Sequence, residues 1–439
     1  MRRYFSFHVE DSTDFKQKIV LYCRKFEYGA VYDSCDYYRN RESEVDYHTA
    51  DLMVGLDHID KVIGGFEAVQ KFQSEINDWM CGYWGYDLKD DLEKLYSVNH
   101  DGLNFDKAVF FQPRYVIRCI GNKWTIGYLA DINKEEEARE IISSIFSQNN
   151  GERIVDKVQF TARVSKNKYC QSIKSILEHI HKGDIYELNY CMEFFAENTE
   201  INPFAIYNTL VEISPTPFSG LLKTKHHYVL CASPERYIKM EKNKIISQPI
   251  KGTAKRGADS IEDDNLKKDL ASCIKERSEN IMIVDLVRND LSRVAEKGSV
   301  KVEELCGIYP FRQVFQMIST VTAKLDKDKT GMDAIRSSFP AGSMTGAPKV
   351  RAMKLIEKYE ETKRGVYSGA IGYFTPEGDF DFNVVIRSLL YNSTNKYLSF
   401  MVGGAITEKS IPEKEYEECL LKAKAILQLF NQDKIIPYE

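Results

Sequence analysis

Residues 366–406 read VYSGAIGYF-TPEGD-FDFNVVIRSLLY-NSTNK-YLSFMVGGAI, which is three apolar runs separated by two short polar connections. The runs are rich in β-branched and aromatic residues, which predicts three successive β-strands. Both connections are short enough to be hairpins, so neighbouring strands would run antiparallel. Strands joined by hairpins rather than by helical crossovers are typical of the α+β class. The predicted strands cover residues 366–374, 380–391 and 398–406.

Helical patterns and further short strands surround this segment. Apolar residues recur at helical spacing over 166–181, and Asn202-Pro203 is a capping residue followed by proline at a first helical position. A polar cluster at 147–151 predicts a loop, and we place a boundary there between an N-terminal lobe, 1–150, and a second region, 151–439. Further helices are predicted over 261–291, with one break near Glu276, and over 412–430; short strands are predicted over 228–231, 237–240 and 242–250.

The composition of the 439 residues is that of an ordinary globular protein, with 43% hydrophobic and 28% charged residues. A net charge of −5 argues against a nucleic-acid partner, because such binding depends on neutralising phosphates. The ten cysteines form no CxxC or CxxH cluster, so neither a structural zinc site nor a disulfide framework is expected. No run of eighteen apolar residues and no signal-like N-terminus is present, which predicts a cytoplasmic protein without a membrane anchor.

One lysine stands out in Pro249-Ile250-Lys251-Gly252-Thr253, at the predicted end of a strand and next to glycine. A lysine held there can be approached closely by a ligand. Burial readily lowers the pKa of a lysine, which would make Lys251 a nucleophile near neutral pH. The alternative is a solvated lysine at a turn, which is the commoner situation for this residue type.

Two pairs of glutamates have a spacing of three residues, Glu276 with Glu279 and Glu415 with Glu418. On helices, each pair would lie on one face. Two pairs facing each other would offer an all-oxygen site to a hard cation such as Mg²⁺. The alternatives are acids that favour a helix dipole at 415–418 and a salt-bridged surface around Lys275 and Arg277.

Three further features could hold a small anion. Residues 339–349 form a glycine-punctuated loop that opens a helix, so its free backbone N–H groups could bind an anion; a well-capped helix is the alternative. Arg387 lies inside an apolar run and needs a partner, either a ligand carboxylate or an internal acid. Gly403-Gly404 follows the last predicted strand core.

Five motifs resemble, in the same order, those of the chorismate-binding family, which contains the anthranilate, aminodeoxychorismate, isochorismate and salicylate synthases. The resemblance implies an anthranilate synthase component I-like fold, with two lobes of antiparallel β-sheets packed face to face and helices outside. It also implies that 151–439 is the chorismate-binding catalytic region. The motifs are Ser233-Pro234-Glu235-Arg236, the Pro-Ile-Lys-Gly-Thr run, ENIMIVDLVRND at 279–290, Thr345-Gly346-Ala347-Pro348-Lys349, and Gly403-Gly404 with the glutamates after it.

Within the family, lysine in the Pro-Ile-x-Gly-Thr motif is typical of aminodeoxychorismate synthases, whereas anthranilate synthases usually carry alanine. The resemblance implies a component I that converts chorismate and ammonia to 4-amino-4-deoxychorismate. Lys251 would attack C2 while the C4 hydroxyl leaves, and ammonia would then add at C4 and expel the lysine. Glu235 matches the family's general acid, which protonates the departing hydroxyl.

The resemblance further implies a bound Mg²⁺, a substrate site and a partner. Glu279 and Glu418 would hold the metal, with Glu276 and Glu415 acting mainly through water. Ammonia would come from a separate glutamine amidotransferase subunit, because the sequence contains no Gly-x-Cys-x-Gly nucleophile motif. The substrate-binding residues would be Thr253, Thr345, Gly346, Tyr373, Arg387, Gly403, Gly404 and Lys422.

Some positions depart from the family pattern. Glu187 stands where this branch more often has glutamine, and Gln316 stands where many relatives carry histidine. The lysine base of the isochorismate branch is absent from Gly183-Asp184-Ile185-Tyr186-Glu187, which disfavours water as the nucleophile. Two alternatives stay open, an anthranilate synthase component I and a non-catalytic homologue that binds chorismate or an amidotransferase.

Overall fold

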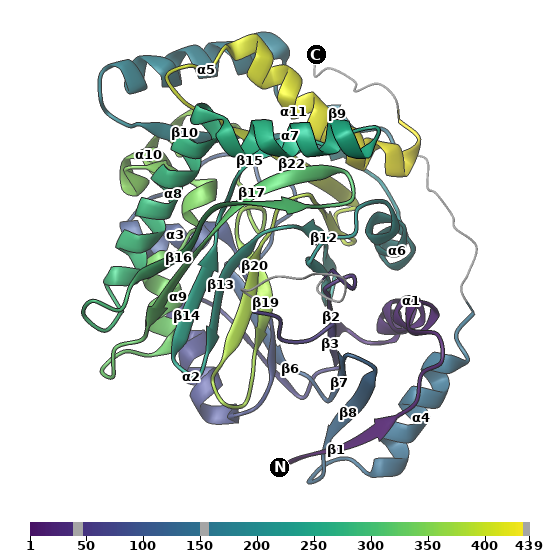
Figure 1. The fold of residues 1–439 in the computed structure, drawn as a ribbon. Helices are drawn as coiled ribbons and strands as arrows, with labels where there is room; N and C mark the ends of the chain where they lie inside the picture. The colour runs from purple at the N-terminus through teal and green to yellow at the C-terminus, as the bar shows by residue number, and fades with distance from the viewer. Residues whose placement is uncertain (38–46, 150–157, 433–439) are drawn as a thin grey trace.

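The computed structural model describes residues 1–37, 47–149 and 158–432. Within them, two large antiparallel β-sheets form the centre of the molecule, and helices lie around them (Figure 1). The predicted α+β fold with antiparallel sheets packed face to face is therefore confirmed.

The first sheet carries the N-terminal strands at one end and the glycine-pair strand near the other. All its pairings are antiparallel. In spatial order it consists of β1 (Arg2–Phe7), β8 (Lys123–Leu129), β7 (Tyr115–Ile120), β3 (Leu52–Leu56), β2 (Tyr28–Asp33), β11 (Phe218–Thr224), β12 (His227–Ser233), β21 (Ser388–Asn392), β22 (Tyr397–Ile406), β10 (Glu187–Ala196) and β18 (Gly346–Ala347), with β9 (Thr161–Ala162) also paired to β10.

The second sheet begins with the strand that carries Lys251. Its pairings are antiparallel as well. In spatial order it consists of β15 (Ile250–Lys255), β17 (Val314–Lys324), β14 (Lys244–Gln248), β13 (Arg236–Glu241), β20 (Phe380–Val384), β19 (Ala370–Phe374), β5 (Met80–Trp84), β6 (Ala108–Gln112) and β4 (Asp60–Ile63), with β16 (Lys301–Pro310) also paired to β17.

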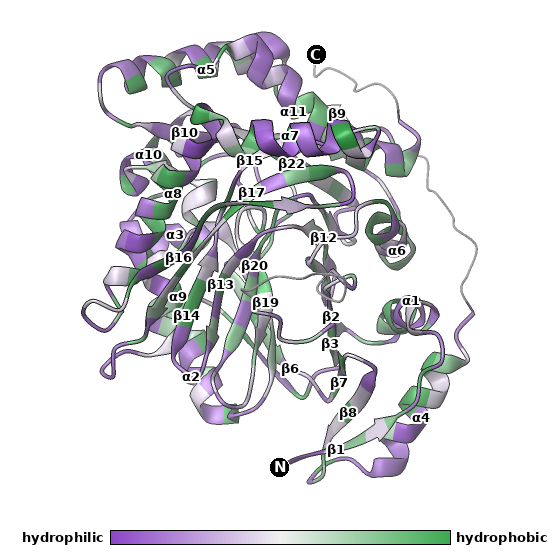
Figure 2. Ribbon diagram, viewed as in Figure 1, coloured by the Kyte–Doolittle hydropathy of each residue, from purple (hydrophilic) through white to green (hydrophobic). Residues whose placement is uncertain are grey.

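The helices cover the outer faces of the sheets, and hydrophilic residues line their outward sides (Figure 2). Four short 3₁₀ turns accompany them in the described residues, at Cys23–Lys25 (η1), Tyr86–Leu88 (η2), Gly342–Met344 (η3) and Gln428–Phe430 (η4). The helices are α1 (Ser12–Tyr22), α2 (Phe66–Ile76), α3 (Lys89–Glu93), α4 (Glu135–Phe146), α5 (Lys166–His181), α6 (Pro203–Ile213), α7 (Ser260–Ser272), α8 (Ile274–Ser292), α9 (Gly331–Ser338), α10 (Lys349–Tyr359) and α11 (Pro412–Leu427).

Two large apolar clusters stabilise this arrangement. One joins the facing sides of the sheets, where Met53 and Leu222 of the first sheet pack with Trp84 and Phe382 of the second. The other fills the space between the first sheet and its helices. Burial of apolar surface is worth about 25 cal/mol per Å², so these layers supply the main stabilising free energy of the fold.

Most predicted elements are confirmed, and one strand is corrected. The helix over 166–181 has the predicted bounds, and Asn202 caps α6 through a hydrogen bond to the Ala205 N–H. The predicted strand 380–391 is instead two strands in different sheets, β20 and β21, because the chain crosses between the sheets at Arg387, which has a φ of 51°. The break in 261–291 lies at Cys273, three residues before the predicted position.

Each sheet contains strands from before and after residue 150. In the second sheet β5 pairs with β19, and in the first sheet β2 pairs with β11. The predicted boundary loop at 147–151 lies partly outside the described residues, and the division at residue 150 stays a prediction. All ten cysteines are described, and every one is a free thiol. Among the described helices, none has the length and apolar character needed to cross a bilayer.

Candidate active site

Lys251 lies inside β15 rather than at the end of a strand, which corrects the prediction. The pairing of β15 with β17 is irregular between Ile250 and Thr253, where four residues oppose three, as in a β-bulge. Gly252 has a φ of 98°, and a Cβ there would lie 3.2 Å from Glu276 Oε2, so glycine is required. Asn280 Nδ2 donates to the Lys251 carbonyl at 3.2 Å. The bulge and this bond fix the backbone that carries the lysine.

The Lys251 side chain is only 12% exposed, and its Nζ lies 3.1 Å from Oε1 of Glu187. Burial favours the neutral amine, but Glu187, Glu279 and Glu235 outweigh it and raise the pKa of Lys251 above its usual value. The prediction of a lowered lysine pKa was therefore wrong for the substrate-free protein, in which Lys251 is an ammonium.

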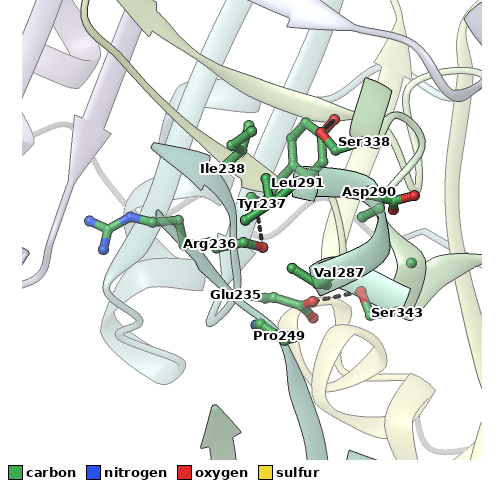
Figure 3. A pocket seen from close by; sticks show the side chains of 13 residues that line it. Glu235, Arg236, Tyr237, Ile238, Pro249, Val287, Asp290, Leu291, Ser338 and Ser343 are labelled. Carbon is green, nitrogen blue, oxygen red and sulfur yellow. Dashed lines mark hydrogen bonds between the residues drawn. The ribbon is translucent and has the colours of Figure 1, made fainter. Parts of the chain in front are cut away.

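Glu235 lies in the turn between β12 and β13 and is 4% exposed. Ser343 of η3 donates a hydrogen bond of 2.6 Å to Glu235 Oε1, and the two side chains face each other in Figure 3. Burial raises the pKa of Glu235 to about 7, although Ser343, Lys251 and Arg387 oppose the shift. A carboxyl group that is half protonated at neutral pH suits a general acid.

A small cavity lies behind Glu235, on the side of α8 and the glycine loop (Figure 3). Polar groups of Asp290, Ser338 and Ser343 line it together with apolar Val287 and Leu291. The neighbouring Arg236 side chain points away from it, toward Asp381, with which it forms an ion pair of 2.9 Å. Glu235 is thus the carboxyl group of its motif that faces the cavity, whereas Arg236 has a structural role.

The structure brings both glutamate pairs near one lysine. Burial would lower the pKa of Lys275, but Glu279, Glu276, Glu415 and Glu418 outweigh it and raise the pKa. Lys275 Nζ lies 3.8 Å from Glu279 Oε1. Burial raises the pKa of Glu279 to about 7. In the described part of the chain, no group of three or more His, Cys, Asp or Glu side chains is arranged so that it could hold a metal ion.

The glycine pair lies beside this acidic cluster, on β22. A Cβ on Gly403 would lie 2.5 Å from Cys191 Sγ, so close strand packing requires this glycine. A Cβ on Gly404 would lie 3.4 Å from Glu415 Oε2. Lys422 of α11 donates to the Gly403 carbonyl and pairs with Glu418 Oε1, both at 2.8 Å. Gly403, Gly404 and Lys422 therefore adjoin the predicted metal site.

Arg387 occupies the crossing between β20 and β21 rather than the inside of a strand. Among the described residues, it forms no ion pair within 4 Å, and Glu235 is the carboxylate that acts on it electrostatically. Its side chain is exposed to solvent. The guanidinium can therefore meet a carboxylate of a ligand beside Glu235.

The glycine loop joins the site through β18. Gly346 pairs with Leu188, and a Cβ on Gly346 would lie 2.2 Å from the Glu187 carbonyl. The buried Thr345 hydroxyl donates to the Gly342 carbonyl at 3.2 Å, so it holds the loop together. Thr253 of β15 is exposed and pairs across the sheet with Gln316. Gln316 is buried, and its Oε1 has no hydrogen-bond partner among the described residues.

Tyr373 lies apart from these groups. Its ring is 5.6 Å from that of Tyr32, and both line a second cavity that neither Lys251 nor Glu235 lines. The structure thus gives no support for its predicted contact with the substrate. Another tyrosine, Tyr367, is buried near Cys191 and Cys419, on the glycine-pair side. No sequence signal separates the two, because both lie in one apolar run.

Arg364 anchors the loop to the first sheet from a completely buried position. Its guanidinium donates to the Met344 carbonyl at 2.7 Å and to the Asn189 carbonyl at 2.8 Å, and it pairs with Glu360 at 2.6 Å. The loop carrying Ser343 and the strand carrying Glu187 are therefore tied by one side chain.

Replacing Arg364 by methionine is expected to lower the free energy of unfolding by about 3–5 kcal/mol, because Glu360 stays behind as an unpaired buried charge. Equilibrium urea unfolding measures this change. Arg351→Met is the matched control, since the exposed Arg351 side chain pairs with Asp184 at 3.1 Å, and little change is expected there. Equal losses in the two variants would contradict the anchoring role.

Known proteins resemble this chain in sequence and in fold. The sequence model of a family described as "chorismate binding enzyme" matches residues 25–428. "Anthranilate synthase component 1" of Acetivibrio thermocellus is 34% identical over 379 residues, which are 81% of this chain and 76% of that protein. "Aminodeoxychorismate synthase" of Streptomyces griseus is 42% identical over 271 residues, or 61% of this chain, but they cover only 37% of that protein.

A crystal structure of anthranilate synthase component I from Streptococcus pneumoniae has the same fold. Its TM-score is 0.75 at 24% identity, and the match covers 88% of this chain and 95% of that one. The anthranilate synthase component I-like fold is therefore confirmed.

Proposed function

This chain belongs to the family of chorismate-binding enzymes, and we propose that it is an aminodeoxychorismate synthase component I that forms 4-amino-4-deoxychorismate. The family membership itself rests on the match over residues 25–428. The choice of product rests on one observation, a buried lysine at position 251 whose Nζ is 3.1 Å from Glu187 and within electrostatic range of Glu235. Direct addition of ammonia at C2, which gives anthranilate, would gain nothing from a nucleophile that blocks C2.

In the proposed reaction, the Lys251 nitrogen bonds to C2 of chorismate, the ring double bonds shift, and the C4–O bond breaks. Glu235 protonates the leaving hydroxyl, which departs as water. Ammonia then bonds to C4, the double bonds shift back, and the C2–N bond to Lys251 breaks. Splitting one difficult substitution at C4 into two displacements is covalent catalysis. Arg387 is placed to hold a substrate carboxylate beside Glu235.

We propose that ammonia is delivered by a separate glutamine amidotransferase and that the enzyme works in the cytosol. The sequence itself contains no Gly-x-Cys-x-Gly motif for a glutaminase nucleophile. Ten free thiols are compatible with a reducing compartment.

The acidic cluster suits Mg²⁺ by the chemistry of its donors. Four carboxylates from α8 and α11 already act together on one cation, Lys275. Oxygen-only donors are those that Mg²⁺ prefers. Glu279 and Glu418 would hold the ion, with Glu276 and Glu415 acting mainly through water. When bound, the metal would supply positive charge to the ring carboxylate of chorismate.

Replacing Glu418 by glutamine is expected to raise the Mg²⁺ concentration for half-maximal activity by about tenfold or more and to lower turnover, because the cluster loses one of its four charges. A magnesium titration of the initial rate measures both. Glu417→Gln is the control, since Glu417 is an exposed glutamate on the same helix. An unchanged titration in Glu418→Gln would remove this residue from the metal site.

Product analysis tests the proposed function directly. Purified protein would be incubated with chorismate, Mg²⁺ and ammonium at mildly alkaline pH, and products separated by HPLC with mass detection. We expect aminodeoxychorismate, which an added lyase converts to 4-aminobenzoate. Anthranilate would overturn the proposal and assign the other branch. If neither appears, even with a partner amidotransferase and glutamine, the chain would be a non-catalytic homologue.

A further inference from the structure

Glu187 is the first residue of β10 and is completely buried. Its Oε1 lies 3.1 Å from Lys251 Nζ. Neither carboxylate oxygen accepts a well-aligned hydrogen bond from the part of the chain that the structure describes. A buried carboxylate is costly unless its lone pairs are used, so this arrangement leaves Glu187 with unused capacity to accept a proton.

The backbone around Glu187 keeps it beside the lysine. Glu187 pairs with Ala347 of β18, and the missing Cβ of Gly346 leaves room for the Glu187 carbonyl. Lys251 is fixed from the other side by its bulge and by Asn280. Both partners are therefore held by strand backbone, Glu187 through its pairing with β18 and Lys251 through the bulge in β15, and neither lies in a loop.

Lys251 needs a proton acceptor before it can attack carbon. Three carboxylates act electrostatically on its ammonium: Glu187 from β10, Glu279 from α8 and Glu235 from the turn between β12 and β13. Glu235 has to deliver a proton to the leaving hydroxyl, and Glu279 belongs to the acidic cluster around Lys275. Of the three, only Glu187 forms an ion pair with Lys251 within 4 Å.

We propose that Glu187 is a further catalytic residue, which removes the proton from the Lys251 ammonium and later returns it. The inference rests on the proposed function, in which Lys251 is the nucleophile. The resemblance described above implies glutamine more often at this position in the aminodeoxychorismate branch, and glutamine cannot take up a proton. With a glutamate at this position, this chain would hold the base for its nucleophile inside the site.

The proton balance closes over one cycle. First, the proton moves from Lys251 Nζ to the Glu187 carboxylate, which leaves a neutral amine and a carboxylic acid. The amine attacks C2, and water leaves C4 with the proton from Glu235. Ammonia then bonds to C4, the C2–N bond breaks, and Lys251 departs as a neutral amine. The new C4 ammonium gives one proton to the Glu235 carboxylate, which restores the acid form of Glu235. Glu187 then returns its proton and restores the original ion pair.

The first half-reaction, run without ammonia, tests this role. Wild-type protein, Mg²⁺ and chorismate are mixed, quenched at intervals, and the covalent adduct on Lys251 is followed by intact mass and peptide mapping. The ratio of the Glu187→Gln rate to the wild-type rate is then measured from pH 6 to 9, which cancels the titration of Glu235 common to both. We expect a ratio near 0.01 at pH 7, since a general base typically contributes about 10²–10⁴-fold.

The pH dependence separates proton transfer from a structural role. In Glu187→Gln the proton has to leave to solvent, so the ratio should rise about tenfold per pH unit until Lys251 is neutral. Glu187→Asp keeps an acceptor, and its ratio should stay constant with pH even if its rate is lower. Glu197→Gln, at an exposed glutamate just past β10, is the control.

Each outcome decides between the two proposals. A Glu187→Gln rate equal to wild type at every pH would overturn the proton-acceptor role and leave Lys251 as the nucleophile. A ratio that rises with pH in Glu187→Asp as well would also overturn it. If the wild-type protein makes aminodeoxychorismate but forms no adduct on Lys251, the covalent step is overturned. The proposed role of Glu187 is then overturned with it.

Discussion

Replacing Lys251 by alanine is expected to lower the rate of amination at C4 by roughly a thousandfold or more, because loss of a covalent nucleophile removes the whole displacement route. Chorismate should still bind, since Arg387, the glycine pair and the acidic cluster are untouched. The rate is measured by HPLC of the aminated product with ammonium as nitrogen source, and binding is measured by calorimetry.

Alanine also removes a buried positive charge, so a second variant separates charge from nucleophilicity. Lys251→Arg keeps a cation beside Glu187, but a guanidinium stays protonated and is a poor nucleophile. Both variants should therefore be inactive, and neither should form the adduct. Lys255→Ala is the matched control, because Lys255 lies on the same strand with a side chain that is 77% exposed. Substantial activity in Lys251→Arg would show that only the charge matters.

The parts of the fold that could be predicted from sequence are those with local causes. Asn202 and the proline after it mark the start of α6 because capping acts within one turn. The crossing at Arg387 could not be predicted, since the apolar run on either side is buried in both sheets and reads as one strand. A positive φ at a non-glycine residue leaves no mark in such a run.

The same distinction holds for the candidate site. The spacing of three placed each glutamate pair on one helical face, but only tertiary structure brings α8 and α11 to the same lysine. The charge state of Lys251 was mispredicted because its nearest carboxylate, Glu187, lies 64 positions earlier in the chain and enters through another sheet. Burial alone lowers the pKa of a lysine, whereas burial with three acids raises it.

Replacing Glu235 by glutamine is expected to slow formation of the Lys251 adduct by about 10²–10⁴-fold, because the C4 hydroxyl then leaves without a proton. Glutamine preserves the size of the side chain and can still contact Ser343. The measurement is again adduct formation without ammonia, so that the titration of ammonium does not enter. Glu241→Gln, at the exposed end of β13, is the control.

The pH profile of the wild-type protein gives the sign of the effect. Glu235 acts in its protonated form, and burial raises its pKa to about 7. If Glu235 is the acid, the wild-type rate of adduct formation should therefore be highest below pH 7. Above pH 7 it should fall about tenfold per pH unit. Ser343→Ala removes a hydrogen bond that stabilises the carboxylate, so the pKa rises further and the fall should begin at higher pH. If Ser343→Ala leaves the pH profile unchanged, the proton for the leaving hydroxyl comes from another group. The same conclusion would follow if Glu235→Gln kept the wild-type rate.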